Sequence, residues 1–241
     1  MKQRLDKTML AKKLVESRSE AENWIRLGRV TVNGREATKP GLFVGDGDTI
    51  VLKAPERYVS RAGLKLASVA SKLNTNFTDT IVLDVGSSTG GFTDYALQHG
   101  AKKVYAVDVG TDQLHPKLRN DSRIELHEKT DIRDFLPAEV PNIVVIDVSF
   151  ISLRQILPYI TTIIDNDTVV LAMVKPQFEA ARHQLGRSGV IKNDKVRREI
   201  LRDFEGWTKK LFVIRDKSDS EVAGAHGNRE RFYKLARTKK R

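Results

Sequence analysis

Beyond about residue 57, apolar positions fall into short runs that alternate with segments of helical spacing. The strand-like runs lie near residues 80–84, 103–108, 123–127, 142–147, 167–174, 211–216 and 230–235. Helix-like segments, including Asp194–Lys209, fall between most of them. Alternation of this kind predicts an α/β fold with a mostly parallel seven-stranded sheet and helices on both faces. The last two runs are close in sequence, which allows an antiparallel edge.

The first 57 residues have a different pattern, in which two helix-like segments precede short strands. Apolar residues recur at helical spacing between Arg4 and Val15, with lysines between them. Ser17 and Ser19 are candidate N-caps for a second helix, over 20–27. Strands are expected at 29–32 and 49–52, with a hairpin turn at Asn33-Gly34. These features predict a small α+β domain.

A loss of periodicity together with Pro55 marks a linker over residues 54–59. We therefore expect two domains, one over 1–57 and one over 58–241. Directly after the linker, Ser60 is a candidate cap for a helix whose apolar positions are Leu64, Leu66, Val69 and Leu73.

A glycine-containing turn follows the strand-like run Thr80–Leu83 and precedes a helix-like segment, Thr93–Gln98. The turn has the sequence Asp84-Val85-Gly86-Ser87-Ser88-Thr89-Gly90-Gly91-Phe92. A strand that ends in such a turn and opens a helix is typical of a nucleotide-binding α/β sheet, because glycine lets the backbone approach a ligand closely. The next apolar run ends at Asp108, whose carboxylate can accept both hydroxyls of an adenosine ribose.

The spacing of the glycines indicates which adenosine ligand to expect. A dinucleotide-binding fold needs G-x-G-x-x-G to meet a pyrophosphate. Here the pattern is Gly86-x-x-x-Gly90-Gly91, with Ser88 where the middle glycine would fall. The turn therefore favours a ligand without phosphate, such as S-adenosylmethionine (SAM). The alternative is an ordinary strand–turn–helix without a ligand, which the placement of Asp108 disfavours.

Charged side chains follow two other predicted strands. Asp147 ends the apolar run 142–146, and Lys175 ends the run 169–174. Ligands in open α/β sheets bind beyond these carboxyl ends. A lysine that closes a buried strand is costly unless it is paired, and Asp147 on the neighbouring strand is the expected partner. The alternative is an ion pair with only a structural role.

Two more charged residues and one loop are candidates for the same region. Lys65 interrupts an apolar helix face in Ser60–Leu66. Glu230 begins the last strand-like run, after Gly227-Asn228-Arg229. Gly186–Gly189 is predicted to be a loop after Lys175, which either closes over a bound substrate or is an ordinary surface loop.

The net charge of +11 is concentrated at the two ends of the chain. Residues 1–57 carry a net charge of +4 and residues 229–241 carry +6, which leaves +1 for the middle. Such ends attract a polyanion such as nucleic acid. A basic tail is also typical of a solvated terminus, so this signal alone is weak.

The composition argues against several classes of protein. Without cysteine, disulfides and thiolate metal sites are excluded, which fits a reducing cytoplasm. The five histidines show no ligand spacing, so we expect no structural metal. The N-terminus has no signal-peptide pattern, and the longest apolar runs are far shorter than the roughly 20 residues that span a bilayer. We expect a cytoplasmic protein without stable membrane association.

Residues 1–57 resemble the S4 RNA-binding domain. The matching residues are Arg4-Leu5-Asp6, Ser17-Arg18, Ala21, Ile25, Gly28, Val30, Val32-Asn33-Gly34, Lys39-Pro40-Gly41 and Gly45-Asp46. The resemblance implies that two helices lay basic side chains on structured RNA, with phosphate contacts setting affinity and salt dependence. The candidates for these contacts are Arg4, Lys7, Lys12, Arg18 and Arg26. The alternative is a small packing domain with a solvated basic surface.

Five motifs in the rest of the chain complete a resemblance to the hemolysin A (TlyA) family of ribosomal RNA 2′-O-methyltransferases. They are Ser60–Leu66, Leu83–Thr93, Asp147-Val148-Ser149-Phe150-Ile151-Ser152, Val174-Lys175-Pro176-Gln177-Phe178-Glu179 and Gly227-Asn228-Arg229-Glu230. The catalytic domain of that family is similar to the FtsJ/RrmJ methyltransferases. The resemblance implies a Rossmann-like SAM-dependent methyltransferase domain behind the S4 domain. It also implies ribosomal RNA or ribosomal subunits as partners, with methyl transfer to a cytidine ribose.

The resemblance also assigns residues to roles. A Lys-Asp-Lys-Glu catalytic tetrad falls on Lys65, Asp147, Lys175 and Glu230, although Glu221 is an alternative fourth member. Contacts to SAM fall on Asp84, Gly86, Ser87, Ser88, Gly90, Gly91, Phe92, Asp108 and Asp131. Asp108 would take the ribose and Asp131 the adenine amino group. The alternative for Asp131 is a carboxylate that only caps its loop.

Three functions remain to be compared. The first is a SAM-dependent RNA 2′-O-methyltransferase, in which Lys175 acts as the base or orients the ribose hydroxyl. The second is a non-catalytic RNA-binding or ribosome-assembly factor that kept the fold. The third is a membrane-lysing toxin, which the family's historical name suggests and which no exported or spanning segment supports.

Overall fold

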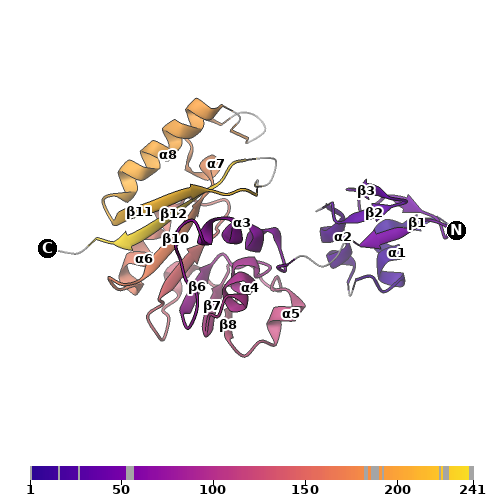
Figure 1. The fold of residues 1–241 in the computed structure, drawn as a ribbon, viewed down its shortest axis with the longest axis horizontal. Coiled ribbons are helices and arrows are strands. Elements are labelled where there is room, and N and C mark those ends of the chain that lie inside the picture. The colour runs from indigo at the N-terminus through magenta and orange to yellow at the C-terminus, as the bar shows by residue number, and fades with distance from the viewer. Residues whose placement is uncertain are drawn as a thin grey trace. The chain divides into compact units, whose positions relative to one another are not determined.

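The computed structural model describes residues 2–15, 17–26, 28–52, 57–181, 184–185, 190–191, 193–222, 224 and 228–238. The chain divides into two compact units, Met1–Glu56 and Arg57–Arg241, and each is described by itself (Figure 1). Half of the expected linker, residues 54–56, lies outside the described residues, as do the Gly186–Gly189 loop and Gly227.

The smaller unit packs two helices against short antiparallel strands. The helices are α1 (Leu5–Ala11) and α2 (Arg18–Arg26). One sheet pairs β1 (Gln3–Arg4) with β4 (Phe43–Val44), and the other has the order β3 (Arg35–Ala37), β2 (Val30–Val32), β5 (Ile50–Leu52). The core consists of Leu5, Met9, Val15, Ala21, Ile25, Val30, Ala37 and Val44. The two helices therefore bury their apolar faces together, as their helical spacing predicts.

In this unit the predicted turn is confirmed, but the predicted end of the first helix is wrong. Asn33 and Gly34 both have positive φ, at 52° and 77°, which is the turn expected between β2 and β3. However, α1 ends at Ala11, well before Val15. The NH groups of Lys13 and Leu14 donate to the carbonyls of Leu10 and Met9, and Lys13 has a φ of 56°. This is a Schellman ending with lysine where glycine is usual, so the sequence gives no warning of it.

The second helix also begins earlier than expected. Its first residue is Arg18, and Ser17 precedes it, with the Ser17 carbonyl accepting from the Ala21 NH. Ser19 lies inside the helix, so its assignment as a cap is wrong.

The larger unit contains a seven-stranded sheet of order β11-β12-β10-β9-β6-β7-β8. The strands are β6 (Ile81–Val85), β7 (Lys103–Val107), β8 (Ile124–His127), β9 (Ile143–Ile146), β10 (Val169–Val174), β11 (Phe212–Asp219) and β12 (Arg231–Arg237). The five strands β6 to β10 are parallel, and β12 is antiparallel to both β10 and β11. The predicted fold class, the seven strands and the antiparallel edge are confirmed.

Helices cover both faces of this sheet (Figure 1). On one face lie α3 (Arg61–Ala70), α4 (Gly91–Gln98) and α5 (Pro116–Arg119), packed with Val82 and alternate strand residues. On the other face lie α6 (Leu157–Ile163) and α8 (Asp194–Thr208), packed with Leu83 and the other strand residues that point to this face. Short helical segments are η1 (Ile132–Asp134), η2 (Leu153–Gln155) and α7 (Pro176–Glu179). Alternate residues of one strand therefore enter two cores, which explains the continuous apolar runs.

The expected cap of α3 is only half correct. Ser60 occupies the N-cap position of this helix, but its hydroxyl makes no capping hydrogen bond. The helix ends at Ala70, so Leu73 lies beyond it while still packing in the core.

Candidate active site

The glycine turn after β6 brings the ends of two strands together. Gly86 has a φ of 81°, and a Cβ on this residue would lie 2.7 Å from the carbonyl oxygen of Asp147. The NH groups of Gly86 and Ser87 donate to the Val107 carbonyl at the end of β7. Ser88, with a φ of 47°, adopts the left-handed region that the missing middle glycine would have favoured. Glycine at position 86 is therefore required by the approach of the β9 loop.

The second half of the turn starts helix α4. Gly90 is the N-cap, with a φ of 88°, and a Cβ on Gly91 would lie 2.8 Å from that of Ala62. Phe92 is buried and lies 5.9 Å from the ring of Phe232. These three residues shape the turn by packing against α3 and β12.

Asp84 is a buried carboxylate under the turn. The Thr93 hydroxyl donates to its Oδ2 at 2.7 Å. Burial raises the pKa of Asp84 to about 7. Among the described residues, Asp84 Oδ1 and the Ser87 hydroxyl are buried without a hydrogen-bond partner. Both residues also line a small cavity.

Asp108 follows β7 and is held by the backbone. Its Oδ2 accepts from the Ser88 NH at 2.8 Å and its Oδ1 from the Gly110 NH at 2.6 Å. The Ser88 hydroxyl donates to Gln113 Oε1 at 2.9 Å. The carboxylate is therefore fixed at the edge of the turn, and Gln113 joins it in the cavity wall. Sequence reasoning missed Gln113, because no spacing signal marks it.

Asp131 caps η1, which was the alternative interpretation of this residue. Its Oδ1 accepts a hydrogen bond from the backbone NH of Arg133, and the Arg133 guanidinium donates to both carboxylate oxygens. This guanidinium lowers the pKa of Asp131 to about 2. Asp131 also lines the same cavity as Asp108, so capping and a place in the cavity wall coexist.

Two adjoining cavities lie at the carboxyl edge of the sheet. The larger has a volume of about 360 Å³ and extends from Gly86 and Asp108 to Asp131 and Phe150. The smaller has a volume of about 150 Å³ and includes Asp84, Ser87 and Lys175. Gly86, Ser88, Asp147 and Ser149 line both. The turn therefore separates two joined compartments.

Lys175 and Asp147 form the ion pair expected from the sequence. Lys175 Nζ lies 2.6 Å from Asp147 Oδ1 and donates to the Ser149 hydroxyl at 2.7 Å. The two residues follow β10 and β9, which are parallel neighbours. Both side chains are largely buried. Two oxygens, one from Asp147 and one from Ser149, therefore hold the lysine beside the smaller cavity.

Lys65 and Glu230 form a second buried pair at the same edge. Lys65 Nζ lies 2.6 Å from Glu230 Oε2, and the glutamate side chain is only 2% exposed. Because Arg231 of β12 is opposite Val174 of β10, Glu230 and Lys175 occupy adjacent positions at the end of the sheet. Glu221, by contrast, pairs with Lys72 at the surface, where its side chain is 65% exposed. The structure therefore brings Glu230, not Glu221, to the other three residues.

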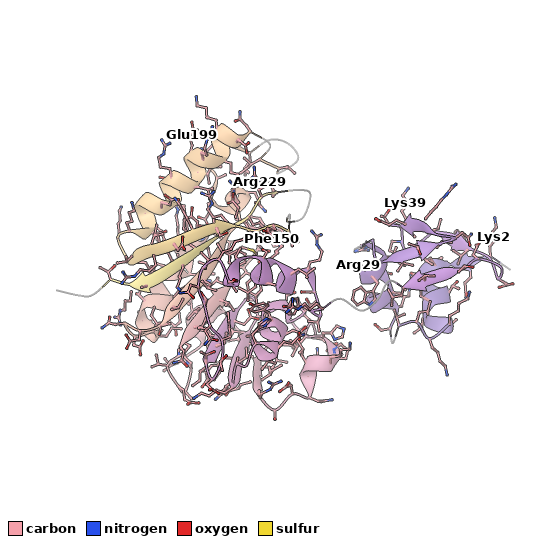
Figure 2. The ribbon with its side chains drawn as sticks, viewed as in Figure 1. Lys2, Arg29, Lys39, Phe150, Glu199 and Arg229 are labelled. Atoms are coloured by element: carbon pink, nitrogen blue, oxygen red, sulfur yellow. The ribbon has the colours of Figure 1, made fainter. Side chains whose placement is uncertain are left out.

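Phe150 is a feature of the site that sequence reasoning left without a role. Its side chain is 92% exposed, its φ is 66°, and it lines the larger cavity. Figure 2 labels it on the larger unit. Its ring lies 5.4 Å from that of Phe178 in α7. An exposed aromatic in a strained turn beside a cavity is typical of a binding surface.

Glu179 fixes the loop that carries Phe150. Its carboxylate accepts from the Ser152 hydroxyl at 2.6 Å and from the Leu153 NH at 2.7 Å. Burial raises its pKa. Because α7 begins directly after Lys175, this contact ties the two loops of the site together.

In the smaller unit, the basic residues expected to contact RNA are partly engaged with carboxylates. Arg4 and Arg18 both contact Asp6, and Arg26 contacts Glu22. Lys12 Nζ donates to the Asp48 carbonyl at 3.4 Å, and the Lys7 side chain is exposed on α1. Figure 2 labels further surface positions of this unit at Lys2, Arg29 and Lys39. Within the described part of the chain, no helix is long and apolar enough to cross a membrane.

The fold and the site define the class of protein. A mostly parallel sheet with a glycine turn after β6, an acidic residue after β7 and a cavity between them is a Rossmann-like nucleotide-binding domain. Residues 58–237 match the FtsJ-like methyltransferase family, and residues 3–50 match the S4 domain. The chain therefore belongs to the FtsJ-like methyltransferases, with an S4 domain in front.

Individual relatives agree with this assignment. The chain is 39% identical to hemolysin A of Brachyspira hyodysenteriae, over 94% of this chain and 97% of that protein. It is 40% identical to the 23S rRNA (cytidine-2′-O)-methyltransferase TlyA of Campylobacter jejuni, over 74% of this chain and 70% of that one. A solved structure of a Streptococcus thermophilus protein that carries a hemolysin designation has a TM-score of 0.77 at 40% identity, covering 98% of this chain and 89% of that chain. The resemblance to the TlyA family found in the sequence is confirmed.

Proposed function

We propose that this protein transfers a methyl group from SAM to a ribose 2′-hydroxyl of ribosomal RNA, with a cytidine as the target. The observation that carries the proposal is the buried Lys175–Asp147 pair, next to the Lys65–Glu230 pair and beside the cavity of the glycine turn. The C. jejuni relative is named a 23S rRNA (cytidine-2′-O)-methyltransferase, which supports the choice of substrate.

The residues of the glycine turn fit SAM as a ligand. Asp108, held by two NH groups, presents a fixed carboxylate to the hydroxyls of a ribose in the larger cavity. Asp131 stands further along the same wall, where we assign it to the adenine amino group. We assign Asp84 and Ser87 to the polar methionine end in the smaller cavity, which Gly86 and Ser88 also line. Gly90 and Gly91, which follow in the same turn, are assigned to the same end of SAM. SAM supplies a methyl group bound to a sulfonium.

Lys175 is the residue that we assign to the reacting hydroxyl. Its ammonium donates to Ser149 and faces Asp147, so its direction is fixed before substrate binds. A charged lysine in this place orients the 2′-oxygen and stabilises its developing negative charge. A neutral lysine would instead accept the hydroxyl proton. A pH–rate profile separates the two, because only the base role gives a rate that rises as the lysine deprotonates.

Lys65 and Glu230 complete the charge balance of the site. The two lysines and the two carboxylates of the four residues sum to zero formal charge. We infer that Glu230 fixes Lys65 so that its ammonium is available to the ribose or to a neighbouring phosphate.

We assign Phe150 to the base of the target nucleotide. A 2′-hydroxyl reaches a recessed lysine most readily when its nucleotide leaves the RNA stack. An exposed ring at the mouth of the larger cavity offers a stacking surface to that base. The S4 unit, residues 1–57, would hold the surrounding ribosomal RNA or ribosomal subunit through its basic side chains. This activity belongs in the cytoplasm, where ribosomes are made.

The alternative functions make different predictions. A non-catalytic assembly factor would bind RNA without consuming SAM, and a membrane-lysing protein would release dye from lipid vesicles. The Lys175–Asp147 pair beside the smaller cavity, with the buried Lys65–Glu230 pair at the adjacent strand end, favours the enzyme.

The decisive experiment compares 2′-O-methyl marks on ribosomal RNA from cells with and without this protein. The proposal requires at least one cytidine mark that disappears with the gene and returns when purified protein and SAM are added to the unmethylated subunits. If all marks persist, and calorimetry detects no SAM binding, the methyltransferase proposal is wrong.

A further inference from the structure

Asp6 is a fully buried carboxylate that lies between two arginines at the surface of the smaller unit. Arg4 Nε and Nη2 donate to its two oxygens at 3.0 and 2.8 Å, and Arg18 Nε donates to Oδ2 at 2.8 Å. The backbone NH of Lys7 donates to Oδ1 at 2.9 Å. Asp6 itself has no exposed surface. Four donors therefore satisfy this carboxylate from inside the unit.

The charges of this cluster do not cancel. One forked arginine is enough to compensate a buried carboxylate, yet Asp6 has two. The hydrogen bond from Arg4 is the main reason that the pKa of Asp6 is lowered, so the group is ionised at neutral pH. Arg4, Asp6 and Arg18 therefore keep one net positive charge, and the sum stays at +1 when Glu22 and Arg26, which pair beside them, are included. This charge lies at the surface, because the side chains of Arg4 and Arg18 are 38% and 48% exposed.

The geometry leaves donors of both guanidiniums available. Arg4 uses Nε and Nη2 on Asp6. Arg18 uses Nε on Asp6, and its Nη2 lies 3.6 Å from Glu22, outside hydrogen-bond range. A guanidinium is a rigid plane with five NH groups, so fixing one edge also fixes the direction of the others. One carboxylate therefore fixes two guanidinium planes that both keep further NH groups, and forked NH groups of this kind bind phosphate oxygens.

We propose that Asp6 is a positioning residue for RNA binding, and that it holds Arg4 and Arg18 as a two-arginine clasp for a backbone phosphate. The proposal rests on the RNA-binding part of the proposed function and adds the device that orients the basic side chains. Arginines fixed in advance lose fewer rotamers on binding than free ones, so the carboxylate strengthens binding of an anion even though its own charge opposes it.

The clasp predicts that removing one particular carboxylate weakens RNA binding. In a simple electrostatic picture, removing a carboxylate from a basic surface strengthens RNA binding. The clasp requires the reverse for Asp6, because Asp6→Asn leaves two arginines without their anchor. Glu22 provides the matched control. It also lies between two arginines, Arg18 and Arg26, but its side chain is 31% exposed instead of buried. Glu22→Gln is expected to leave binding unchanged or to strengthen it.

The experiment uses the full chain and a fluorescein-labelled RNA hairpin of mixed sequence, with anisotropy read from 50 to 300 mM KCl. Asp6→Asn is expected to weaken binding about fivefold to tenfold and to reduce the salt slope by about one phosphate contact, or about 0.9. Binding by Asp6→Asn that equals or exceeds that of the wild type overturns the clasp. If the wild-type chain itself does not bind the hairpin, both the clasp and the RNA-binding part of the proposed function are wrong.

A second pair of variants covers the case in which Asp6→Asn unfolds the smaller unit. Arg18→Lys keeps the charge but loses the planar fork and the Nε donor to Asp6. Arg35→Lys makes the same change at an exposed arginine of β3, outside the clasp. The clasp predicts weaker RNA binding for Arg18→Lys and unchanged binding for Arg35→Lys, at equal melting temperatures. Equal RNA affinity of the two variants overturns it.

Discussion

The Lys65 ammonium lies 2.6 Å from the Glu230 carboxylate, and this ion pair joins helix α3 to the start of β12. Both side chains are buried or nearly so. A buried charge is tolerated only when its partner is present, so the loss of either side chain leaves the other uncompensated. The pair therefore couples the segment that follows the linker to the last strand of the sheet, at the edge where Lys175 and Asp147 lie.

Replacement of Glu230 tests which glutamate completes the site. We expect Glu230→Gln to lower single-turnover methyl transfer at least about a hundredfold, because Lys65 loses its buried counter-charge. The measurement is incorporation of labelled methyl from SAM into unmethylated ribosomal subunits. Glu221→Gln is the control, since Glu221 pairs with Lys72 at the surface, and its rate should equal that of the wild type. Equal losses in the two variants would contradict the assignment.

Replacement of Lys175 separates chemistry from cofactor binding. We expect Lys175→Ala to abolish methyl transfer while SAM still binds, because the lysine lines the smaller cavity and Asp108, which we assign to the ribose of SAM, lines the larger one. Calorimetry with SAM and single-turnover transfer provide the two readouts. Lys72→Ala serves as the control for loss of a lysine. Retained transfer in Lys175→Ala would remove this residue from the reaction.

Asp108 is expected to act on SAM affinity. Asp108→Asn removes the charge that the Ser88 and Gly110 NH groups stabilise, and it replaces one acceptor oxygen by a donor facing an NH group. We expect the dissociation constant for SAM to rise about tenfold to a hundredfold, in line with the loss of a hydrogen bond to a charged group. Asp112→Asn, at an exposed carboxylate paired with Arg119, should change SAM binding little. Calorimetric titration distinguishes the two, and identical affinities would rule out Asp108 as the ribose acceptor.

Phe150 is expected to act on RNA and not on SAM. Phe150→Ala removes the exposed ring from the mouth of the cavity, so we expect KM for the ribosomal substrate to rise about tenfold, the size of one lost stacking contact. Leu136→Ala removes another exposed apolar side chain that does not line either cavity, and it should leave KM unchanged. A Phe150→Ala enzyme with normal KM for RNA and weakened SAM binding would place the ring against the cofactor instead.

Much of this site follows from strand order alone. Lys175 and Asp147 come directly after two apolar runs, and parallel neighbours end at one edge, so their contact was predictable. Strand order alone does not select Glu230 over Glu221. The family motif Gly227-Asn228-Arg229-Glu230 favours Glu230, whose position in the structure depends on the register that sets Arg231 opposite Val174. Register is fixed by packing across the whole sheet, which a local sequence window does not contain.

The features missed in the sequence depend on tertiary contacts. The exposure of Phe150 follows from its positive φ and from the hold of Glu179 on Ser152 and Leu153. The burial of Asp6 between Arg4 and Arg18 joins two helices, so a count of basic residues on each helix overstates the number of free ones. In both cases the sequence showed the residue types but not the conformation that gives them their role.

Asp84 is expected to make the stability of the larger unit depend on pH. Folding raises the pKa of its carboxyl from an ordinary value of 3.8 to about 7, mainly through burial. The folded state therefore holds this proton more tightly than the unfolded state does. The stabilising contribution is complete below about pH 4, and it is lost as the pH rises through about 7.

The test compares the wild type with Asp84→Asn, which keeps an acceptor for the Thr93 hydroxyl but does not ionise. Between pH 5 and pH 8, the free energy of unfolding of the wild type should fall by about 3 kcal/mol relative to that of the variant. The loss is about 1.4 kcal/mol for each pH unit between pH 5 and pH 7, and it levels off above pH 7. Urea unfolding read by Trp207 fluorescence, in a Trp24→Phe background, reports the larger unit. Asp112→Asn, at an exposed carboxylate, should follow the wild type across this range. Parallel curves for the wild type and Asp84→Asn would show that Asp84 is ionised in the folded protein throughout, so its unpartnered oxygen would already carry a charge before SAM binds.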